Sequence, residues 1–179
     1  MMINFNKPIK LASVALLLYL TGCNKVPHFN MMKDDINIMN DNDREKIAKT
    51  AEKYDGSMDW IVHTTKDDFP SGTNKCNKFI YDVLEEAGVT APKYDDGFPV
   101  VAADWANSSF TIPDWKHMGY GASWERGDII AERRNYTDAT GHCGIAISNS
   151  QVIGARGVGI TKEGHDFGDN VTVRRYIGQ

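Results

Sequence analysis

The chain has 179 residues, of which 41% are hydrophobic, and this is enough material for one domain with a core of its own. It contains 20 basic and 24 acidic residues, which gives a formal net charge of −4 at pH 7. A net acidic chain without a basic stripe is a poor ligand for nucleic acid, so we exclude nucleic-acid binding from the expected functions.

The first 22 residues have the pattern of a lipoprotein signal peptide. Lys7 and Lys10 form a weakly basic start, and the apolar run 11–20 is too short to span a bilayer. The run ends in Leu-Thr-Gly before Cys23, which favours cleavage before that residue and acylation of its thiol. An ordinary signal peptide that happens to contain a cysteine is the alternative. We therefore expect a lipid-anchored protein of the cell envelope. The residue after Cys23 is Asn24 and not Asp, which resembles the default sorting of lipoproteins to the outer membrane, so we expect it at the periplasmic face of an outer membrane or at the cell surface.

The next segment, 23–41, is polar and rich in Asn and Asp, which predicts a tether between the lipid anchor and a domain spanning 42–179. A first helix is expected from residue 44, capped by Asn42 or Asp43 and ended by Gly56.

The clearest predicted element is a helix that ends at Gly88 and has Thr73 or Asn74 as its cap. Its apolar residues recur at helical spacing, and they are Phe79, Ile80, Val83, Leu84 and Ala87. Cys76 lies in the first turn of this helix.

The rest of the chain predicts loops and then strands. A short helix is expected at 101–106 within a loop-like stretch, and the expected strands are 129–131, 141–147, 151–155, 158–161 and 171–177. Helices first and strands later predict an α+β domain with an antiparallel sheet.

Cys76 has the position of an activated nucleophile, because a helix N-terminus favours the thiolate. A nucleophilic cysteine also needs a histidine that the fold brings close to it. The five histidines are His28, His63, His117, His142 and His165. We choose His142 as the base because it opens a predicted strand, and a rigid element places a base better than a loop does.

Two other interpretations of these residues stay open. One is a structural disulfide between Cys76 and Cys143, and the other is a zinc site made of Cys76, His142, Cys143 and His165, although no close-spaced pair such as CxxC is present. Adjacent residues of a strand point to opposite faces, so we expect Cys143 to face away if His142 faces Cys76.

Three motifs occur in order along the chain: TNKCNKFIYDVL at 73–84, RGDII at 126–130 and GHCGIAI at 141–147. Together they resemble the nucleophile helix, the strand-opening Gly-Asp and the catalytic-histidine strand of the NlpC-type, papain-like peptidoglycan hydrolases. That superfamily includes the CHAP amidases and the amidase effectors of interbacterial secretion systems.

The resemblance implies a papain-like α+β fold in which the nucleophile helix packs on a C-terminal antiparallel sheet. It implies a cysteine amidase or peptidase that cuts an amide bond of the cell-wall stem peptide through an acyl-enzyme, without a metal or other cofactor. Cys76 would attack the carbonyl, His142 would move the proton, and the backbone N–H of Cys76 would stabilise the oxyanion. Tyr54 and Trp60 lie in the region where relatives place a tyrosyl or aromatic group.

One position departs from the family pattern. Many relatives hold a polar group that orients the histidine at the position of Gly154, which has no side chain. We favour Asp166 for this role because a carboxylate fixes the tautomer of an imidazole. Asn149, His165, Asp169 or no third residue at all are the alternatives.

Two other functions fit the same fold. One is a non-catalytic, wall-binding lipoprotein, and the other is a cysteine hydrolase or acyltransferase with a substrate outside the wall. The partners expected for an enzyme of the first kind are the peptidoglycan stem peptide and, through Cys23, a membrane. No cognate inhibitor protein can be named from the sequence.

Overall fold

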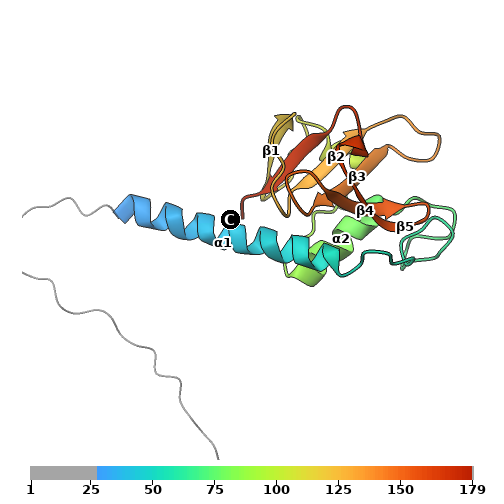
Figure 1. Ribbon diagram of the computed structural model, residues 1–179, viewed down its shortest axis with the longest axis horizontal. Helices are drawn as coiled ribbons and strands as arrows, with labels where there is room; N and C mark the ends of the chain where they lie inside the picture. Colours follow the sequence, from blue (N-terminus) through green and yellow to red (C-terminus); the bar gives the residue numbers. More distant parts are fainter. Residues whose placement is uncertain (1–27, 179) are drawn as a thin grey trace, which may run out of the picture.

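The computed structural model describes residues 28–178, with side chains from residue 36 onward, as a long helix packed beside one α+β domain (Figure 1). The predicted signal peptide and Cys23 lie outside the described residues. Within 28–178, no helix combines the length and the apolar character needed to cross a bilayer.

Three helices precede the sheet: α1 (His28–Glu52), α2 (Cys76–Ala87) and the short α3 (Ala102–Trp105). The strands are β1 (Trp115–Tyr120), β2 (Ile129–Arg133), β3 (Gly141–Ala146), β4 (Val152–Arg156), β5 (Gly159–Glu163) and β6 (Thr172–Tyr176). They form one sheet in the order β1-β6-β2-β3-β4-β5, and all five pairings are antiparallel. The predicted α+β class with an antiparallel sheet is therefore confirmed.

Alternation along the strands gives the sheet two apolar faces. Ile129, Ala131 and Ile145 belong to one buried cluster together with the apolar stripe of α2. Their neighbours Ile130 and Ala146 belong to a second cluster on the other face, which Phe167, Trp124 and Val173 complete. Figure 1 shows α2 lying against the sheet beside the C-terminal half of α1, so the first cluster is the main core.

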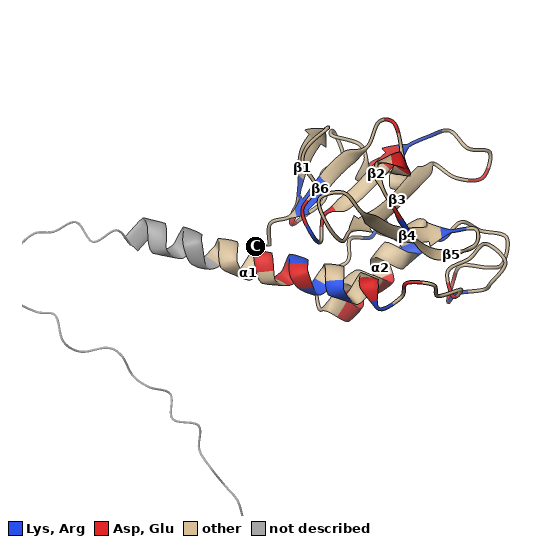
Figure 2. Ribbon diagram, in the orientation of Figure 1, with Lys and Arg blue, Asp and Glu red and all other residues tan. Residues whose placement is uncertain are grey.

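The first helix begins well before its predicted start. Residues 28–41, predicted as part of a tether, are helical and continuous with the predicted helix. Charged residues of both signs alternate along α1 (Figure 2), and pairs such as Lys46–Asp43 at 2.7 Å support the exposed face. Asn42 and Asp43 therefore lie inside the helix and do not cap it.

Arg126 ties α1 to the sheet. Its guanidinium donates to Glu45 at 2.8 Å and to Glu52 at 3.0 Å, both on α1, and also to the carbonyl of Ile147 after β3. Between Arg126 and β2, Gly127 has φ +83°, and a Cβ there would lie 2.2 Å from the carbonyl oxygen of Arg44. The Gly of the RGDII motif is thus required by the close approach of α1.

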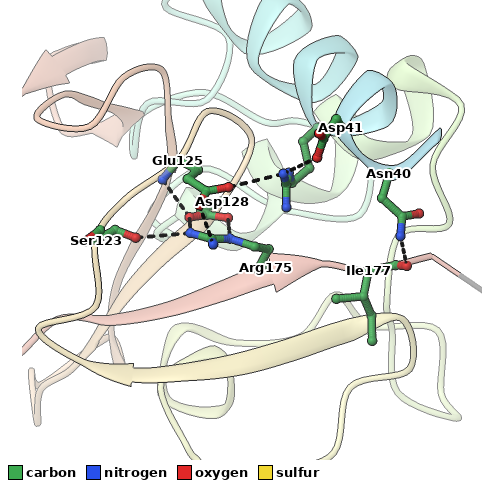
Figure 3. A network of polar contacts seen from close by, with 8 residues as sticks. Asn40, Asp41, Ser123, Glu125, Asp128, Arg175 and Ile177 are labelled. Atoms are coloured by element: carbon green, nitrogen blue, oxygen red, sulfur yellow. Dashed lines mark hydrogen bonds and ion pairs between the residues drawn. The ribbon is translucent and has the colours of Figure 1, made fainter. Parts of the chain in front are cut away.

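The Asp of the same motif holds β6 in place. Asp128 is completely buried and receives two hydrogen bonds from Arg175 of β6, at 3.0 and 2.8 Å, and one from the backbone N–H of Glu125 at 2.8 Å. Figure 3 shows this carboxylate between Glu125 and Arg175. Arg175 also donates to the carbonyl of Ser123, and Asn40 of α1 donates to the carbonyl of Ile177 just after β6. The Gly-Asp motif therefore has a structural role.

Two details of the predicted elements differ. The N-cap of α2 is Lys75, without a side-chain cap hydrogen bond, because Thr73 bonds back to the carbonyl of Pro70 at 2.7 Å and Asn74 reaches Asp138. Strand β1 was not predicted, since its sequence WKHMGY lacks apolar alternation and its pairing with β6 shifts register near Gly119. The C-cap prediction is confirmed, with Gly88 in the left-handed conformation at φ 74°.

Candidate active site

The predicted nucleophile begins α2. Cys76 is the first residue of the helix, so its backbone N–H is one of the amide groups that have no partner inside the helix. These free N–H groups and the helix dipole favour an anion at this point. The thiol is 8% exposed and free of any disulfide.

The predicted base lies beside it. His142 is the second residue of β3, is 6% exposed, and lines the same cavity as Cys76. The ring also packs against Phe167, with centroids 4.7 Å apart. The fold therefore brings together Cys76 and His142, which are 66 positions apart in the sequence.

Two glycines lie beside this imidazole. A Cβ at Gly141 would lie 2.0 Å from the carbonyl oxygen of Glu132, so this glycine is required by the close approach of β2. A Cβ at Gly154 would lie 3.3 Å from the carbonyl oxygen of Cys143 and 3.5 Å from Nε2 of His142. Gly154, the position at which relatives hold a polar group, is therefore next to the imidazole, where little room remains for a side chain.

Glu163 supplies the carboxylate that faces the imidazole. Its Oε1 lies 3.6 Å from Nε2 of His142, and its own position is fixed by Arg156, whose Nε donates to Oε1 at 2.7 Å. At 3.6 Å the Nε2 group has no hydrogen-bond partner, and catalytic hydrogen bonds are often this long before substrate binds. Since Nε2 faces Glu163, we assign Nδ1 to Cys76.

The choice of Asp166 as the third residue is therefore corrected. Asp166 is exposed in a short 3-10 helix, and its carboxylate accepts a hydrogen bond from the backbone N–H of Gly164 at 3.1 Å. Of the alternatives, Asn149 is exposed in a turn, His165 packs on Trp124, and Asp169 pairs with Arg134 at 3.1 Å. Glu163, which was not singled out from the sequence, ends β5 and lies two residues beyond the predicted strand 158–161. Continuing the alternation from Thr161 would have placed both side chains on one face of the sheet.

Cys143 does not face away from the nucleophile. It is completely buried in the cluster that contains Cys76 and Ile145, and its proximity lowers the pKa of Cys76. His142 lines the same cavity as Cys76, so both neighbours on β3 lie near the start of α2. Both thiols are free, so a contact with His142 and a contact with Cys143 do not exclude each other.

The contacts shift the titration of the three groups in a consistent way. Hydrogen bonding from Cys143 lowers the pKa of Cys76 well below its ordinary value, against the opposing effect of burial, and His142 lowers it further. Burial alone would lower the pKa of His142, but contact with Cys76 and Glu163 raises it. Burial raises the pKa of Cys143 well above its usual range. The arrangement favours a thiolate on Cys76 paired with an imidazolium on His142.

The carboxylate itself is held ionised. Burial would raise the pKa of Glu163, but the neighbouring imidazole of His142 and the hydrogen bonds from Arg156 outweigh it and lower the pKa to about 2. A permanent negative charge at this distance stabilises the imidazolium and fixes the orientation of the ring.

Two cavities meet at the sulfur of Cys76. The first, of about 410 Å³, has an apolar wall formed by Phe69, Phe98 and Val101 and is bordered by Asp68. The second, of about 290 Å³, is lined by His142, Trp60, Tyr136 and Arg156. Cys76 therefore lines a cavity on each of two sides.

The loop between β2 and β3 separates the two cavities. Asp138 and Ala139 line both of them, and the carbonyl of Asp138 accepts a hydrogen bond from the side chain of Asn74 at 3.3 Å. This bond joins the loop to the residues that lead into α2. The loop therefore forms a shared wall above the nucleophile.

A buried lysine holds the opposite wall. Lys75 is 2% exposed, and its ammonium donates to the carbonyls of Thr73 at 2.9 Å and of Ile61 and Pro70 at 3.2 Å each. It thereby gathers the segment 61–73 around the start of α2, and burial lowers the pKa of Lys75.

The aromatic residues upstream have different places. Tyr54 lies on the contact between α1 and α2, where its hydroxyl bonds Glu86 and this hydrogen bond raises the pKa of Tyr54 to about 12. Trp60 lines the second cavity and donates from Nε1 to Asp82 at 2.8 Å. Trp60 is therefore a wall of the site, whereas Tyr54 supports the helix that carries the nucleophile.

In the described part of the chain, no three histidine, cysteine or carboxylate side chains are arranged to hold a metal ion. The zinc interpretation of Cys76, His142, Cys143 and His165 therefore gains no support from the geometry. Neither a protein-family model nor a curated protein matches this chain significantly.

Proposed function

We propose that the protein is a cysteine amidase or peptidase with a papain-like arrangement, which cuts an amide bond in the stem peptide of peptidoglycan. The observation that carries the proposal is the contact between Cys76, at the N-terminus of α2, and His142 of β3, at the point where two cavities meet. The order of the three sequence motifs along the chain supports the choice of substrate.

The proposed reaction begins with the thiolate of Cys76. It attacks the carbonyl carbon of the scissile amide, and the backbone N–H of Cys76 stabilises the negative charge that develops on the oxygen. The imidazolium of His142 gives its proton to the leaving nitrogen, so the amine departs and a thioester remains on Cys76. His142 then takes a proton from water, the hydroxide attacks the thioester, and the acid leaves with the thiolate restored.

Glu163 acts in both halves of this cycle. It stabilises the positive charge on His142 and keeps Nδ1 directed at Cys76, while Arg156 holds Glu163 itself. Because His142 lines the second cavity, the half of the substrate that leaves as an amine lies there, and the acyl half lies in the first cavity. A wall substrate also agrees with the expected lipid anchor on Cys23, which would keep the domain in the envelope.

The direct test measures release of free amines from purified sacculi. We expect Cys76→Ala to abolish release while its melting temperature stays within a few degrees of wild type. His165→Ala, a substitution of an exposed side chain stacked on Trp124, serves as the matched control and retains release. Continued release by the Cys76→Ala protein at the wild-type rate would eliminate the mechanism.

The same preparation separates the other two functions. A wild-type protein that sediments with sacculi, releases no amine and reacts slowly with iodoacetamide at Cys76 would be a wall-binding protein. A wild-type protein that releases no amine but reacts quickly at Cys76 would be a cysteine hydrolase or acyltransferase with another substrate. Mass analysis of the digested wall fragments identifies the bond that is cut.

A further inference from the structure

A second thiol lies against the proposed nucleophile, and the mechanism above does not use it as a reacting group. Cys143 is completely buried on β3 and belongs to the same buried cluster as Cys76, which begins the helix α2 that packs on β3. The two thiols are close enough for each to shift the pKa of the other, and both are free. Neighbouring thiols can form a disulfide when their Cβ atoms approach to about 4 Å.

The two thiols differ in how a reagent can reach them. Cys76 is 8% exposed and lines both cavities, whereas Cys143 is 0% exposed and lines neither of the two. A small oxidant that enters either cavity therefore meets Cys76 first. Cys76 is also the sulfur that the helix terminus and His142 hold as a thiolate, which is the form that oxidants attack.

We propose that Cys76 and Cys143 form a reversible redox pair, in which Cys143 traps oxidised Cys76 as a disulfide. The effect on catalysis rests on the proposed function, because the disulfide would remove its nucleophile. The chemistry of the pair itself requires only two neighbouring thiols of unequal exposure and a small peroxide as the oxidant.

The electrons and atoms balance in two steps. The thiolate of Cys76 attacks one oxygen of the peroxide, so an S–O bond forms, the O–O bond breaks, and hydroxide leaves with the proton of the His142 imidazolium as water. The thiol of Cys143 then attacks the sulfur of Cys76, so an S–S bond forms, the S–O bond breaks, and the oxygen leaves with the proton of Cys143 as a second water. The two sulfurs lose two electrons, and one peroxide becomes two waters.

The disulfide would protect the nucleophile in addition to switching it off. A sulfenic acid that meets no thiol is oxidised further to sulfinic and sulfonic acids, which ordinary thiol reductants do not reverse. A disulfide stops this sequence at a stage from which reduction restores the thiolate. Oxidation would therefore make a reversible inactive state.

Hydrogen peroxide applied to the purified full-length protein, followed by tryptic digestion without reduction, tests the proposal. Cleavage after lysine and arginine places Cys76 in the peptide 76–78 and Cys143 in the peptide 135–156. We expect these two peptides to appear as one disulfide-linked species. Dithiothreitol should then restore iodoacetamide labelling of Cys76 to most of its starting level.

Cys143→Ala and Cys143→Ser provide the comparison. In both variants we expect sulfinic and sulfonic acid at Cys76, and recovery of labelling after dithiothreitol roughly tenfold lower than in wild type. Labelling is expressed relative to the untreated sample of the same variant, so a change in the basal reactivity of Cys76 does not affect the comparison. If either variant fails to fold, the linked peptide in wild type still decides the question.

Two results would overturn the redox pair. One is wild-type protein in which peroxide gives sulfinic acid at Cys76 without the linked species, and the other is a disulfide that joins Cys76 to Cys23 or to a second copy of the chain. None of these measurements depends on hydrolysis of the wall. A protein that forms the linked peptide but releases no amine from sacculi would support the pair and refute the proposed function.

Discussion

Two regions of the molecule bury ionisable groups, and they treat them differently. At β2 and β6 every oxygen of Asp128 has a close partner, from Arg175 or from the backbone of Glu125, at 2.8 to 3.0 Å (Figure 3). At β3 and β5 the Nε2 atom of His142 has no hydrogen bond, and its nearest carboxylate oxygen is 3.6 Å away. Complete pairing fixes structure, whereas incomplete pairing beside a cavity leaves groups free to move protons.

This difference in pairing matters because the two regions contain two of the three motifs that resemble the NlpC-type hydrolases, RGDII and GHCGIAI. The Gly-Asp at 127–128 and the Gly-His at 141–142 look alike in the sequence, yet one holds β6 and α1 in place and the other faces the nucleophile. Substitutions in the first region should therefore change stability without changing chemistry, and substitutions in the second should do the reverse.

The largest effect is expected from His142→Ala. Loss of the group that moves protons should reduce the rate of amine release by about 10³-fold. The rate of iodoacetamide labelling of Cys76 below pH 7 should fall as well, because the thiolate loses its imidazolium partner. An amine-release rate within tenfold of wild type would show that His142 is not the base.

Asp128→Ala should have the opposite signature. Burial raises the pKa of Asp128, and the hydrogen bond to Asp128 raises the pKa of Arg175. Removing the carboxylate leaves a guanidinium that is only 14% exposed without its main partner. We expect a loss of about 3 kcal/mol in the free energy of unfolding, measured by urea denaturation.

The activity of the folded Asp128→Ala molecules is the second measurement on this variant. This activity should remain close to that of wild type when it is measured without urea and well below the melting temperature of the variant. A large loss of activity in protein that is still folded would mean that the two regions are coupled, which would contradict the division drawn above.

Gly127→Ala should destabilise the protein by about 2 kcal/mol, because the new Cβ meets the backbone of α1 as well as an unfavourable φ. Gly97→Ala is the matched control, since Gly97 has φ +88° and no atom within 4 Å of the added carbon. It should cost only about 1 kcal/mol, from backbone strain alone. Equal losses in the two variants, measured by thermal denaturation, would show that the approach of α1 is not tight.

Local signals in the sequence identified most of the fold. The apolar stripe of α2, its C-cap glycine and the alternation of the central strands predicted the correct class, α+β with an antiparallel sheet. The start of α1 could not be located, because the sequence from residue 28 to 41 is polar and lacks a sustained helical period. Strand β1 could not be predicted, because its sequence has no apolar alternation and it forms only by pairing with β6, which is distant in the sequence.

The site could be predicted only in part, for a geometric reason. Cys76 and His142 have local signals, a helix start and a strand start. The proximity of Cys143 to Cys76 could not be derived, because β3 pairs with β4 only at Ile145 and Ala146, and ideal alternation does not describe its first residues. Glu163 was missed because its approach to His142 depends on the register of β4 with β5, which no local pattern reveals.

Glu163→Gln should have the smallest effect of these variants, and it tests most directly whether Glu163 acts on His142. Glu163 is ionised at any assay pH, because its pKa is about 2, and the substitution removes this charge while keeping a group that can bond Arg156. The charge favours the protonated imidazole, so its loss lowers the pKa of His142. The alkaline limb of the pH–rate profile, where the imidazolium loses its proton, should then move to lower pH by about one unit.

The rate at the optimum should fall by about tenfold, because an ion-paired partner no longer orients the imidazole. Asp166→Asn is the matched control, since it also neutralises one carboxylate in the segment that follows β5 but changes only a bond to the backbone of Gly164. Its profile should superimpose on that of wild type. A shift in the Asp166 variant together with an unchanged Glu163 variant would return the orienting role to Asp166 and would mean that the 3.6 Å approach of Glu163 has no part in catalysis.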